Sequence, residues 1–440
     1  MKHSPQRFAA VVAAISLSLI AASITKAAAQ TVPTQTKQTQ TVEFNSASNS
    51  PSFLAESALP APDDNVRVNL LQHNLHTTTP GVSPATLTLG SLAPVHGANA
   101  EEGEAVKAVL TAYFADLNQR GGIYNRRITL RFADTGPDRA TTVRNATQLV
   151  HQPIFAFVAP FAPGAEGALA GLAHEKKVPL AGMLALSVPD DPANREVFYL
   201  LPGFEQLVQE LGRFAVQRQN VAAGKSAVVF GDRSQQLELS AAMQAMWKES
   251  GASLPAEYVS PENPAELVKS FKAWGIDTVF LFATSDVVTP WIKAADDAKW
   301  YPKLFLLGPL LDDSVLTGPA PLQGRMFAVY PALEPNLQGL SEFDKFLERH
   351  NLSGEHRLLL MSAYCAAEVL QTALTRAGKN PTRENLLLAL EQMHDFRTGL
   401  FPPITFGPDR RIGSHKAEFV CLDLVSHSFE PSCSEPVTQK

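Results

Sequence analysis

The sequence predicts an α/β fold of two lobes, each built on a parallel β-sheet that helices cover on both faces. Short apolar segments typical of strands alternate with amphipathic segments of about 10 to 15 residues, and strands joined through helices run parallel. The alternation restarts after Pro202, which indicates a second lobe. The chain of 440 residues is also longer than a single hydrophobic core usually serves.

In the first lobe, each short apolar segment is followed by a segment with the helical period. The segment IFAFVAP, at residues 154–160, is a continuous apolar run, as expected of a strand buried on both faces of a parallel sheet. The expected strands are 86–92, 128–134, 154–160 and 178–183, and the expected helices between them are 99–118, 140–150 and 165–175.

In the second lobe, the same pattern predicts helices at 205–218, 235–250, 264–274 and 287–298, and strands at 225–232, near 258, at 277–284 and at 303–308. A strand at 325–332 is expected to return the chain toward the first lobe, where helices at 339–350, 355–376 and 382–393 follow. Segments 404–411 and 417–425 are expected to form a terminal hairpin, because Gly407-Pro408-Asp409 has turn chemistry. We therefore assign residues 85–202 plus 330–395 to lobe 1 and residues 203–329 plus 396–440 to lobe 2, with a hinge where the chain crosses.

The N-terminal residues predict export. A basic start with Lys2 and Arg7 precedes an Ala-rich apolar run at residues 8–24, and Ala27-Ala28-Ala29 has the small residues of a signal peptidase site. We expect residues 1–29 to be a signal peptide cleaved near Ala29; the alternative is an uncleaved anchor helix. No later stretch is expected to span a bilayer. Residues 30–84 are rich in Thr, Gln, Ser and Pro, so they are expected to form a flexible leader.

Charge and cysteine content narrow the possible partners. The 37 basic and 43 acidic residues make the chain mildly negative, without a basic stripe, so nucleic acid and anionic membrane surfaces are poor partners and a small molecule is favoured. Three cysteines are too few for a disulfide scaffold or a cysteine-rich metal site. Cys421 and Cys433 are the plausible disulfide pair, and Cys365 lies in an apolar helical pattern; the alternative is three unpaired thiols.

No linear enzyme motif in the chain has the context that its chemistry requires. There is no Gly-x-Ser-x-Gly elbow and no Gly-x-Gly-x-x-Gly turn, and the pair His174-Glu175 is followed by two lysines instead of completing a zinc-binding His-Glu-x-x-His motif. The sequence therefore predicts no enzyme activity, no cofactor and no metal site.

Parallel sheets bind ligands in loops at the carboxyl ends of their strands, and two lobes place such loops around one cleft. The loops expected there are 91–99, 161–164, 185–187, 233–236, 284–286 and 309–313.

Residues 112–150, reading AYFADLNQRGGIYNRRITLRFADTGPDRATTVRNATQLV, resemble the leucine/isoleucine/valine-binding protein family of type I periplasmic binding proteins. That family has a helix ending in an Asn-x-x-Gly-Gly-Ile turn, then a strand ending in an acidic residue, then an Asp-x-x-x-Ala helix. The matching positions are Asn118, Gly121, Gly122, Ile123, Asp134 and Asp138. The expected order of elements from Ala85 to about Val425 also follows the family.

The resemblance implies two Rossmann-like lobes joined by a three-crossover hinge, a periplasmic location, and ligand capture by hinge closure. It implies an inner-membrane ATP-binding-cassette (ABC) permease as partner. In relatives that bind amino acids, hydroxyls and backbone N–H groups of the first lobe hold the carboxylate, and an acidic residue of the second lobe takes the ammonium group.

The cleft loops depart from this pattern. After the third strand the turn Pro160–Gly164 lacks hydroxyls, and after the fourth strand Ser187 is the one side-chain hydroxyl. Gln236 stands where a tyrosine is expected, and Asp312 lies near the usual acidic position. The candidate ligand-binding residues are Ser91, His96, Phe161, Ala162, Ala185, Ser187, Gln236, Thr284, Ser285, Leu310 and Asp312.

Several candidates also have simpler interpretations. Phe161 and Leu310 fit lobe packing as well as a ligand wall, Asp312 fits a helix N-cap, and His96 fits a solvated loop. The expected function is a periplasmic solute-binding protein of an ABC importer that captures an amino acid or related carboxylate, with an apolar or aromatic ligand suiting Phe161 and Leu310. The alternative is a ligand-sensing module that acts on a signalling protein without transport.

Overall fold

The computed structural model describes residues 79–97, 99–188, 194–251, 254–333 and 337–431. These residues all belong to one compact unit. The predicted signal peptide, and the predicted leader as far as residue 78, lie outside the described residues.

The first lobe contains a five-stranded sheet in the order β2-β1-β3-β4-β5, with every neighbouring pair parallel, as predicted. Its strands are β1 (Thr86–Ala93), β2 (Arg127–Asp134), β3 (Ala156–Val158), β4 (Leu180–Ala181) and β5 (Val197–Phe198). Its helices are α3 (Ala100–Gln119), α4 (Arg139–His151), α5 (Glu166–Lys176), α10 (Leu337–Arg349), α11 (Arg357–Ala377) and α12 (Arg383–Glu391). Strand β5 was not predicted, because it has only two residues.

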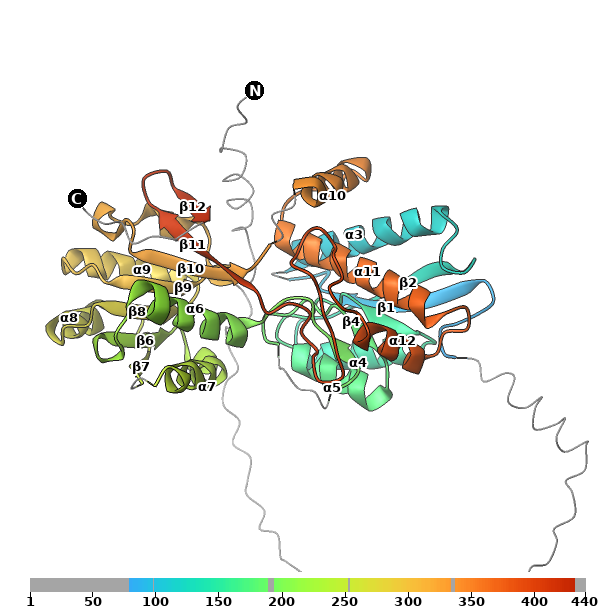
Figure 1. Cartoon of the computed structure of the whole chain (residues 1–440), viewed down its shortest axis with the longest axis horizontal. Helices are drawn as coiled ribbons and strands as arrows, with labels where there is room; N and C mark the ends of the chain where they lie inside the picture. The colour runs from blue at the N-terminus through green and yellow to red at the C-terminus, as the bar shows by residue number, and fades with distance from the viewer. Residues whose placement is uncertain (1–78, 98, 189–193, 252–253, 334–336, 432–440) are drawn as a thin grey trace, which may run out of the picture. The chain divides into compact units, whose positions relative to one another are not determined.

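Successive side chains of each strand point to opposite faces of the sheet, so the first lobe has two hydrophobic layers. Leu87 and Leu89 pack with α3 and α11, whereas Leu92 and Phe157 pack with α4 and α5. Figure 1 shows α3 and α11 on one side of this sheet and α4 and α5 on the other. The sheet is therefore covered on both faces, as its continuous apolar strands require.

The second lobe contains a seven-stranded sheet in the order β12-β11-β10-β9-β8-β6-β7. Its strands are β6 (Ser226–Phe230), β7 (Ala256–Val259), β8 (Thr278–Phe282), β9 (Lys303–Leu307), β10 (Met326–Pro331), β11 (Ala417–Asp423) and β12 (Ser428–Pro431). Its helices are α6 (Phe204–Gln219), α7 (Arg233–Glu249), α8 (Ala265–Ala273) and α9 (Ser285–Asp297), with short 3₁₀ turns η1 (Ala223–Lys225), η2 (Gly308–Leu310), η3 (Asp313–Thr317) and η4 (Ala320–Leu322). The strands β6 to β10 pair in parallel, while β11 pairs antiparallel with both β10 and β12.

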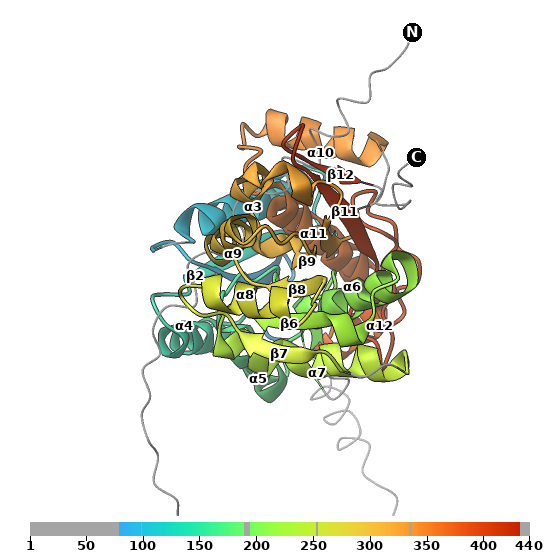
Figure 2. The same cartoon turned by 90° about the vertical axis from the view of Figure 1, so that its left-hand side faces the viewer.

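Aromatic rings fill one layer of the second lobe. Phe280, Phe305 and Phe327 lie on adjacent strands, with ring centroids 5.0 Å and 5.2 Å apart in turn, and they pack under α6 and α7. The opposite face of the same sheet packs against α8 and α9. Figure 2 shows these two helix pairs on either side of the sheet.

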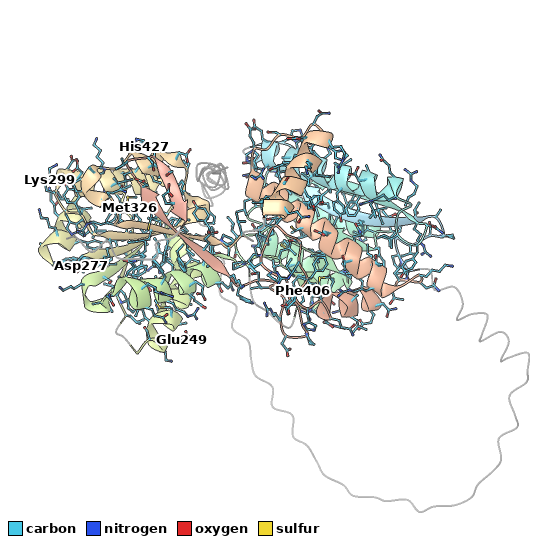
Figure 3. All side chains as sticks on the ribbon, turned by 45° about the horizontal axis from the view of Figure 1, so that its top comes forward. Glu249, Asp277, Lys299, Met326, Phe406 and His427 are labelled. Atoms are coloured by element: carbon cyan, nitrogen blue, oxygen red, sulfur yellow. The ribbon has the colours of Figure 1, made fainter. Side chains whose placement is uncertain are left out.

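The predicted terminal hairpin is wrong in its first segment. β11 pairs with β12 and β10, and residues 404–411 instead belong to a long crossover that packs on the first lobe. Phe406 meets Phe198 edge-on with ring centroids 5.1 Å apart. Figure 3 labels Phe406 in the first lobe and Met326 in the second. Residues 396–414 were assigned to lobe 2, yet their buried side chains, including Ile404 and Ile412, join the clusters of lobe 1.

The described chain passes between the lobes three times: after β5, after β10 and after α12. The third crossover binds the first through the backbone, because Tyr199 N–H donates to Arg411 O at 2.9 Å and Gly413 N–H donates to Tyr199 O at 2.8 Å. It also binds the second, since Ala332 N–H donates to Lys416 O at 3.0 Å. The three connections are therefore hydrogen-bonded to one another and do not act as independent linkers.

A buried cation anchors the third crossover to the first lobe. The Arg411 side chain is 2% exposed, lies 4.8 Å from the centroid of the Phe198 ring, and donates to Glu391 Oε1 at 2.9 Å. Arg195 donates to the same oxygen from Nε at 2.9 Å. Hydrogen bonds from Arg195 and Arg411 hold the pKa of Glu391 below its ordinary value, against the opposing effect of burial.

Helix α11 crosses the core of the first lobe. By length and composition it is the one helix of the described residues that could span a bilayer, contrary to the sequence expectation, but most of its surface is buried inside the protein. It carries Glu368, whose Oε2 is buried with no hydrogen-bond partner among the described residues. Burial and the nearby charge of Glu342 raise the pKa of Glu368 to about 7.

Replacing Glu391 by Gln is expected to lower the free energy of unfolding by about 3–5 kcal/mol at pH 7, because the buried Arg411 loses its counter-charge. The matched control Glu384→Gln, which removes an exposed partner of Arg195, is expected to change it by about 1 kcal/mol or less. Because the folded pKa of Glu391 is depressed, the gap between wild type and Glu391→Gln should shrink as the pH falls below the ordinary range of a glutamate. Urea denaturation at pH 7 and pH 3 measures the free energy of unfolding of wild type and of both variants. Equal losses in the two variants would contradict the anchor.

Glu368→Gln is expected to have the opposite pH dependence. A carboxyl whose folded pKa is raised destabilises the fold as pH rises through about 7. The free energy of unfolding of the variant should therefore exceed that of wild type by about 1–3 kcal/mol at pH 8 and by almost nothing at pH 4. Denaturation across this range measures the difference, with Glu348→Gln, an exposed carboxylate of α10, as control. A constant difference between variant and wild type at all pH values would rule out the buried titration.

Candidate functional site

A predominantly apolar pocket lies where the strands β3 and β4 end and the crossovers begin. Its empty volume is about 630 Å³, part of which is open solvent. The lining residues are Phe161, Glu166, Met183, Leu184, Ala185, Leu186, Leu200, Leu201, Pro202, Pro331, Leu358, Leu359 and Ser362. They come from the loops after β3 and β4, the start of α5, the first crossover, the end of β10 and the start of α11.

The backbone holds the two loops of the pocket side by side. Phe161 N–H donates to Leu92 O at 2.8 Å, and Leu184 N–H donates to Pro160 O at 3.0 Å, so the parallel pairing continues beyond β3 and β4. Ala159, just before this turn, has a φ of +41°, which is uncommon for a residue with a side chain. These contacts fix Phe161 and Leu184 in the pocket wall.

Gly182 allows α11 to approach this loop. Its φ is +70°, and a Cβ atom there would lie 2.3 Å from Ala366 Cβ on α11. Only glycine therefore fits both the backbone conformation and the contact. The close approach brings the first turns of α11, with Leu358, Leu359 and Ser362, to the pocket. The Ser362 hydroxyl is already used, since it donates to Leu358 O at 2.8 Å.

Glu166 is the charged residue of the pocket lining, at the first position of α5. It is half-buried, and burial raises the pKa of its carboxyl above the ordinary value. Hydrogen bonds from its own backbone N–H and from that of Gly164 oppose this shift, and the charge of Glu238 adds to it.

Of the first-lobe residues expected from the sequence, some line the pocket and others do not. Phe161 and Ala185 line the pocket. Ala162 is buried beside them, in the cluster under α5. Ser187 is exposed and does not line the pocket, so the hydroxyl expected after the fourth strand is absent from it. Ser91 is fully buried in β1, where its hydroxyl donates to Ala159 O at 3.5 Å.

His96 lies in a solvated loop beside the acidic end of β2. Its side chain is 84% exposed, and its Nδ1 lies 3.2 Å from Asp134 Oδ2. Although partial burial opposes it, hydrogen bonds from the backbone of Gly136 and Val95 and from His96 hold the pKa of Asp134 below its ordinary value. The histidine therefore pairs with a loop-organising carboxylate and does not line the pocket.

The second-lobe candidates do not line this pocket either. Thr284 and Ser285 begin α9, and Asp312 N–H donates to Ser285 Oγ at 2.7 Å, so these loop residues do lie together. Asp312 is the N-cap of η3, where its carboxylate accepts from Ser314 N–H at 2.9 Å, as its simpler interpretation predicted. Leu310 packs in the aromatic layer, which also agrees with its packing interpretation.

Gln236 is half-buried on α7 and contacts neighbouring polar groups. Its side chain accepts from Arg233 and lies 3.5 Å from Glu257 Oε2. The loop before it is organised by Asp232, whose carboxylate accepts from Gln235 N–H at 2.9 Å and caps α7.

Some residues reach the pocket from far along the chain and were not among the candidates expected from the sequence. Leu358 and Leu359 were part of an expected helix, and Pro331 ended an expected strand, but no local pattern indicated that they would reach this pocket. Glu166 did carry a signal: an acidic residue in the first turn of the helix that directly follows a cleft loop.

The described residues contain no group of three or more metal-ligating side chains. Cys365 is a free thiol buried in α11, and Cys421 is disulfide-bonded. Cys433 lies outside the described residues, so the pairing of Cys421 with Cys433 stays a prediction.

Comparisons with known proteins agree with this architecture. A model of the periplasmic binding protein family matches residues 86–423. No curated protein matches the sequence. Among solved structures, a fatty acid ABC transporter substrate-binding protein from Thermomonospora curvata superposes with a TM-score of 0.63 at 16% identity, covering 80% of this chain and 92% of that one.

Two further structures share the fold. A branched chain amino acid ABC transporter protein from Thermus thermophilus with bound valine has a TM-score of 0.63 at 17% identity, covering 82% of this chain and 97% of the other. A possible leucine/isoleucine/valine-binding protein from Rhodopirellula baltica has a TM-score of 0.61 at 16% identity, covering 83% of this chain and 100% of the other. The family match over residues 86–423, the two parallel sheets and the three crossovers together show that the chain belongs to the periplasmic binding protein family and has its type I fold, which confirms the resemblance found in the sequence.

Proposed function

We propose that the chain is the periplasmic solute-binding protein of an ABC importer and that it captures a small molecule with a large apolar part. The pocket beside β3 and β4 is the observation that carries this proposal. Apart from Glu166 and Ser362, its lining side chains are apolar, among them Phe161, Met183 and Leu184. Enclosing apolar surface is favourable by roughly 25 cal/mol per Å², so an apolar body supplies affinity in such a pocket.

The position of the pocket supports a coupling between ligand binding and the hinge. Leu200 to Pro202 belong to the first crossover and Pro331 ends the strand that leads into the second, and all of them line the pocket. A ligand there contacts two of the chain segments on which the lobes turn. It therefore biases the hinge, and a ligand-dependent shape is what a permease can recognise.

The ligands named for the structural neighbours are consistent with an apolar molecule. One is described as a fatty acid transporter protein and another contains bound valine. The pocket lining contains no cysteine or histidine, and its one hydroxyl, that of Ser362, donates to Leu358 O at 2.8 Å, which supports binding without catalysis. Residues 1–29 have the composition of a signal peptide, which supports delivery to the periplasm.

Thermal unfolding against a library of amino acids, amines, alcohols, amides and carboxylates with aliphatic or aromatic bodies tests the proposal. A ligand at about 100 times its Kd is expected to stabilise the protein by about 2.7 kcal/mol, which raises the melting temperature visibly. Leu186→Gln places a polar amide in the pocket wall, and binding should weaken by about one order of magnitude or more.

The matched control is Leu388→Gln on α12, where the leucine is 40% exposed and lies outside the pocket. This variant should keep the full ligand-induced shift. If no chemical class shifts the melting temperature of wild type, or if Leu186→Gln binds as well as Leu388→Gln, the proposed binding site is wrong.

A further inference from the structure

Two carboxylates that interact through their charges lack a cationic partner among the described residues, and one of them lines the pocket. Glu166 lines it, and Glu238 on α7 is close enough for its charge to affect Glu166. Among the described residues, neither carboxylate forms an ion pair with a lysine, arginine or histidine, although such pairs occur elsewhere in the fold. Glu238 Oε1 is buried and has no hydrogen-bond partner there. Desolvated carboxylates in this state favour a counter-charge.

The protein's own carboxylate occupies the N-terminus of α5 in the pocket wall. Glu166 is the first residue of α5, and it accepts hydrogen bonds from its own N–H and from Gly164 N–H. The N-terminus of a helix attracts negative charge through such unpaired N–H groups. A ligand carboxylate at this end would have to displace Glu166 and would add a third negative charge beside Glu238.

We propose that the pocket takes a ligand with an apolar body and a cationic amine end, and that the amine lies against Glu166 and Glu238. The inference rests on the proposed function and names the chemical class of its ligand. An ammonium group supplies the counter-charge that Glu166 lacks and a donor for Glu238 Oε1, and charge-assisted hydrogen bonds of this kind are the strong ones. The apolar body then contacts Phe161, Met183 and Leu184. This class differs from the carboxylate expected from the sequence.

Matched probes that share one apolar body test the proposal. Calorimetric titration of the purified protein with 2-phenylethylamine, 2-phenylethanol and phenylacetate compares a cationic, a neutral and an anionic end on one ring. A second series with 3-methylbutylamine, 3-methylbutanol and 3-methylbutanoate does the same on an aliphatic body. In at least one series the amine should bind at least tenfold more tightly than the alcohol, and the acid should bind most weakly.

Glu166→Gln and Glu238→Gln remove the charges while keeping the side-chain size, and each should weaken amine binding at least tenfold with little effect on the alcohol. The matched control is Glu175→Gln, an exposed carboxylate at the other end of α5, which should leave all affinities unchanged. Circular dichroism and melting curves confirm that each variant folds.

The possible failures are distinguishable. If in both series the acid binds as tightly as its amine, the inference is overturned while the solute-binding function stands. If neither amine binds, or if amine binding survives in both glutamine variants, the inference is also overturned. The wider library then decides separately whether the pocket binds any small molecule.

Discussion

The buried Arg411 holds together the part of the fold on which function depends. Its guanidinium lies over the Phe198 ring and pairs with Glu391, which in turn pairs with Arg195. A charge this deeply buried requires its partner, since a missing counter-charge leaves an uncompensated ion in the core. The consequence is that the third crossover is fixed to the edge of the first sheet and supports the other two.

The pocket follows from this arrangement. Residues 411–414 extend the edge of the sheet beside Tyr199 and Leu200, so the first crossover enters the pocket at a fixed position. The loops after β3 and β4 continue to pair beyond their strands, and Gly182 lets α11 approach them. Rigid walls and hinge segments thus meet at one place, which suits a site whose occupancy must change the relation between lobes. The ionisable group in this wall, Glu166, then decides which end of a ligand fits.

Much of the fold was predictable from the sequence because buried parallel strands have a strong local pattern. The runs at 227–230, 279–282 and 304–307 are continuously apolar, and the helices between them follow the helical period. β5 has two residues and carries no such pattern. The hairpin error at 404–411 came from a turn, Gly407-Pro408-Asp409, that is real locally but leads to a pairing with Tyr199 far away in sequence.

The site was less predictable than the fold. Phe161 and Ala185, which the sequence places just after strand ends, lie in the pocket wall, because loop positions follow from strand positions. Leu358, Leu359 and Pro331 reach the pocket through tertiary packing that no local pattern encodes. Asp312 and His96 have side chains that could bind a ligand, but Asp312 accepts from the Ser314 backbone N–H and His96 contacts the Asp134 carboxylate. Local hydrogen bonding competes with ligand binding for short polar side chains, and the sequence does not show which one prevails.

Hydrogen exchange of the hinge amides tests the central claim most directly. Any ligand that raises the melting temperature is added to the protein, and exchange is followed at the amides of Tyr199, Gly413 and Ser414, which join the first and third crossovers. Exchange there should slow markedly on binding, together with the amides of Phe161 and Leu184 in the pocket wall. Protection confined to surfaces away from the pocket, with these amides unchanged, would contradict the coupling of the pocket to the hinge.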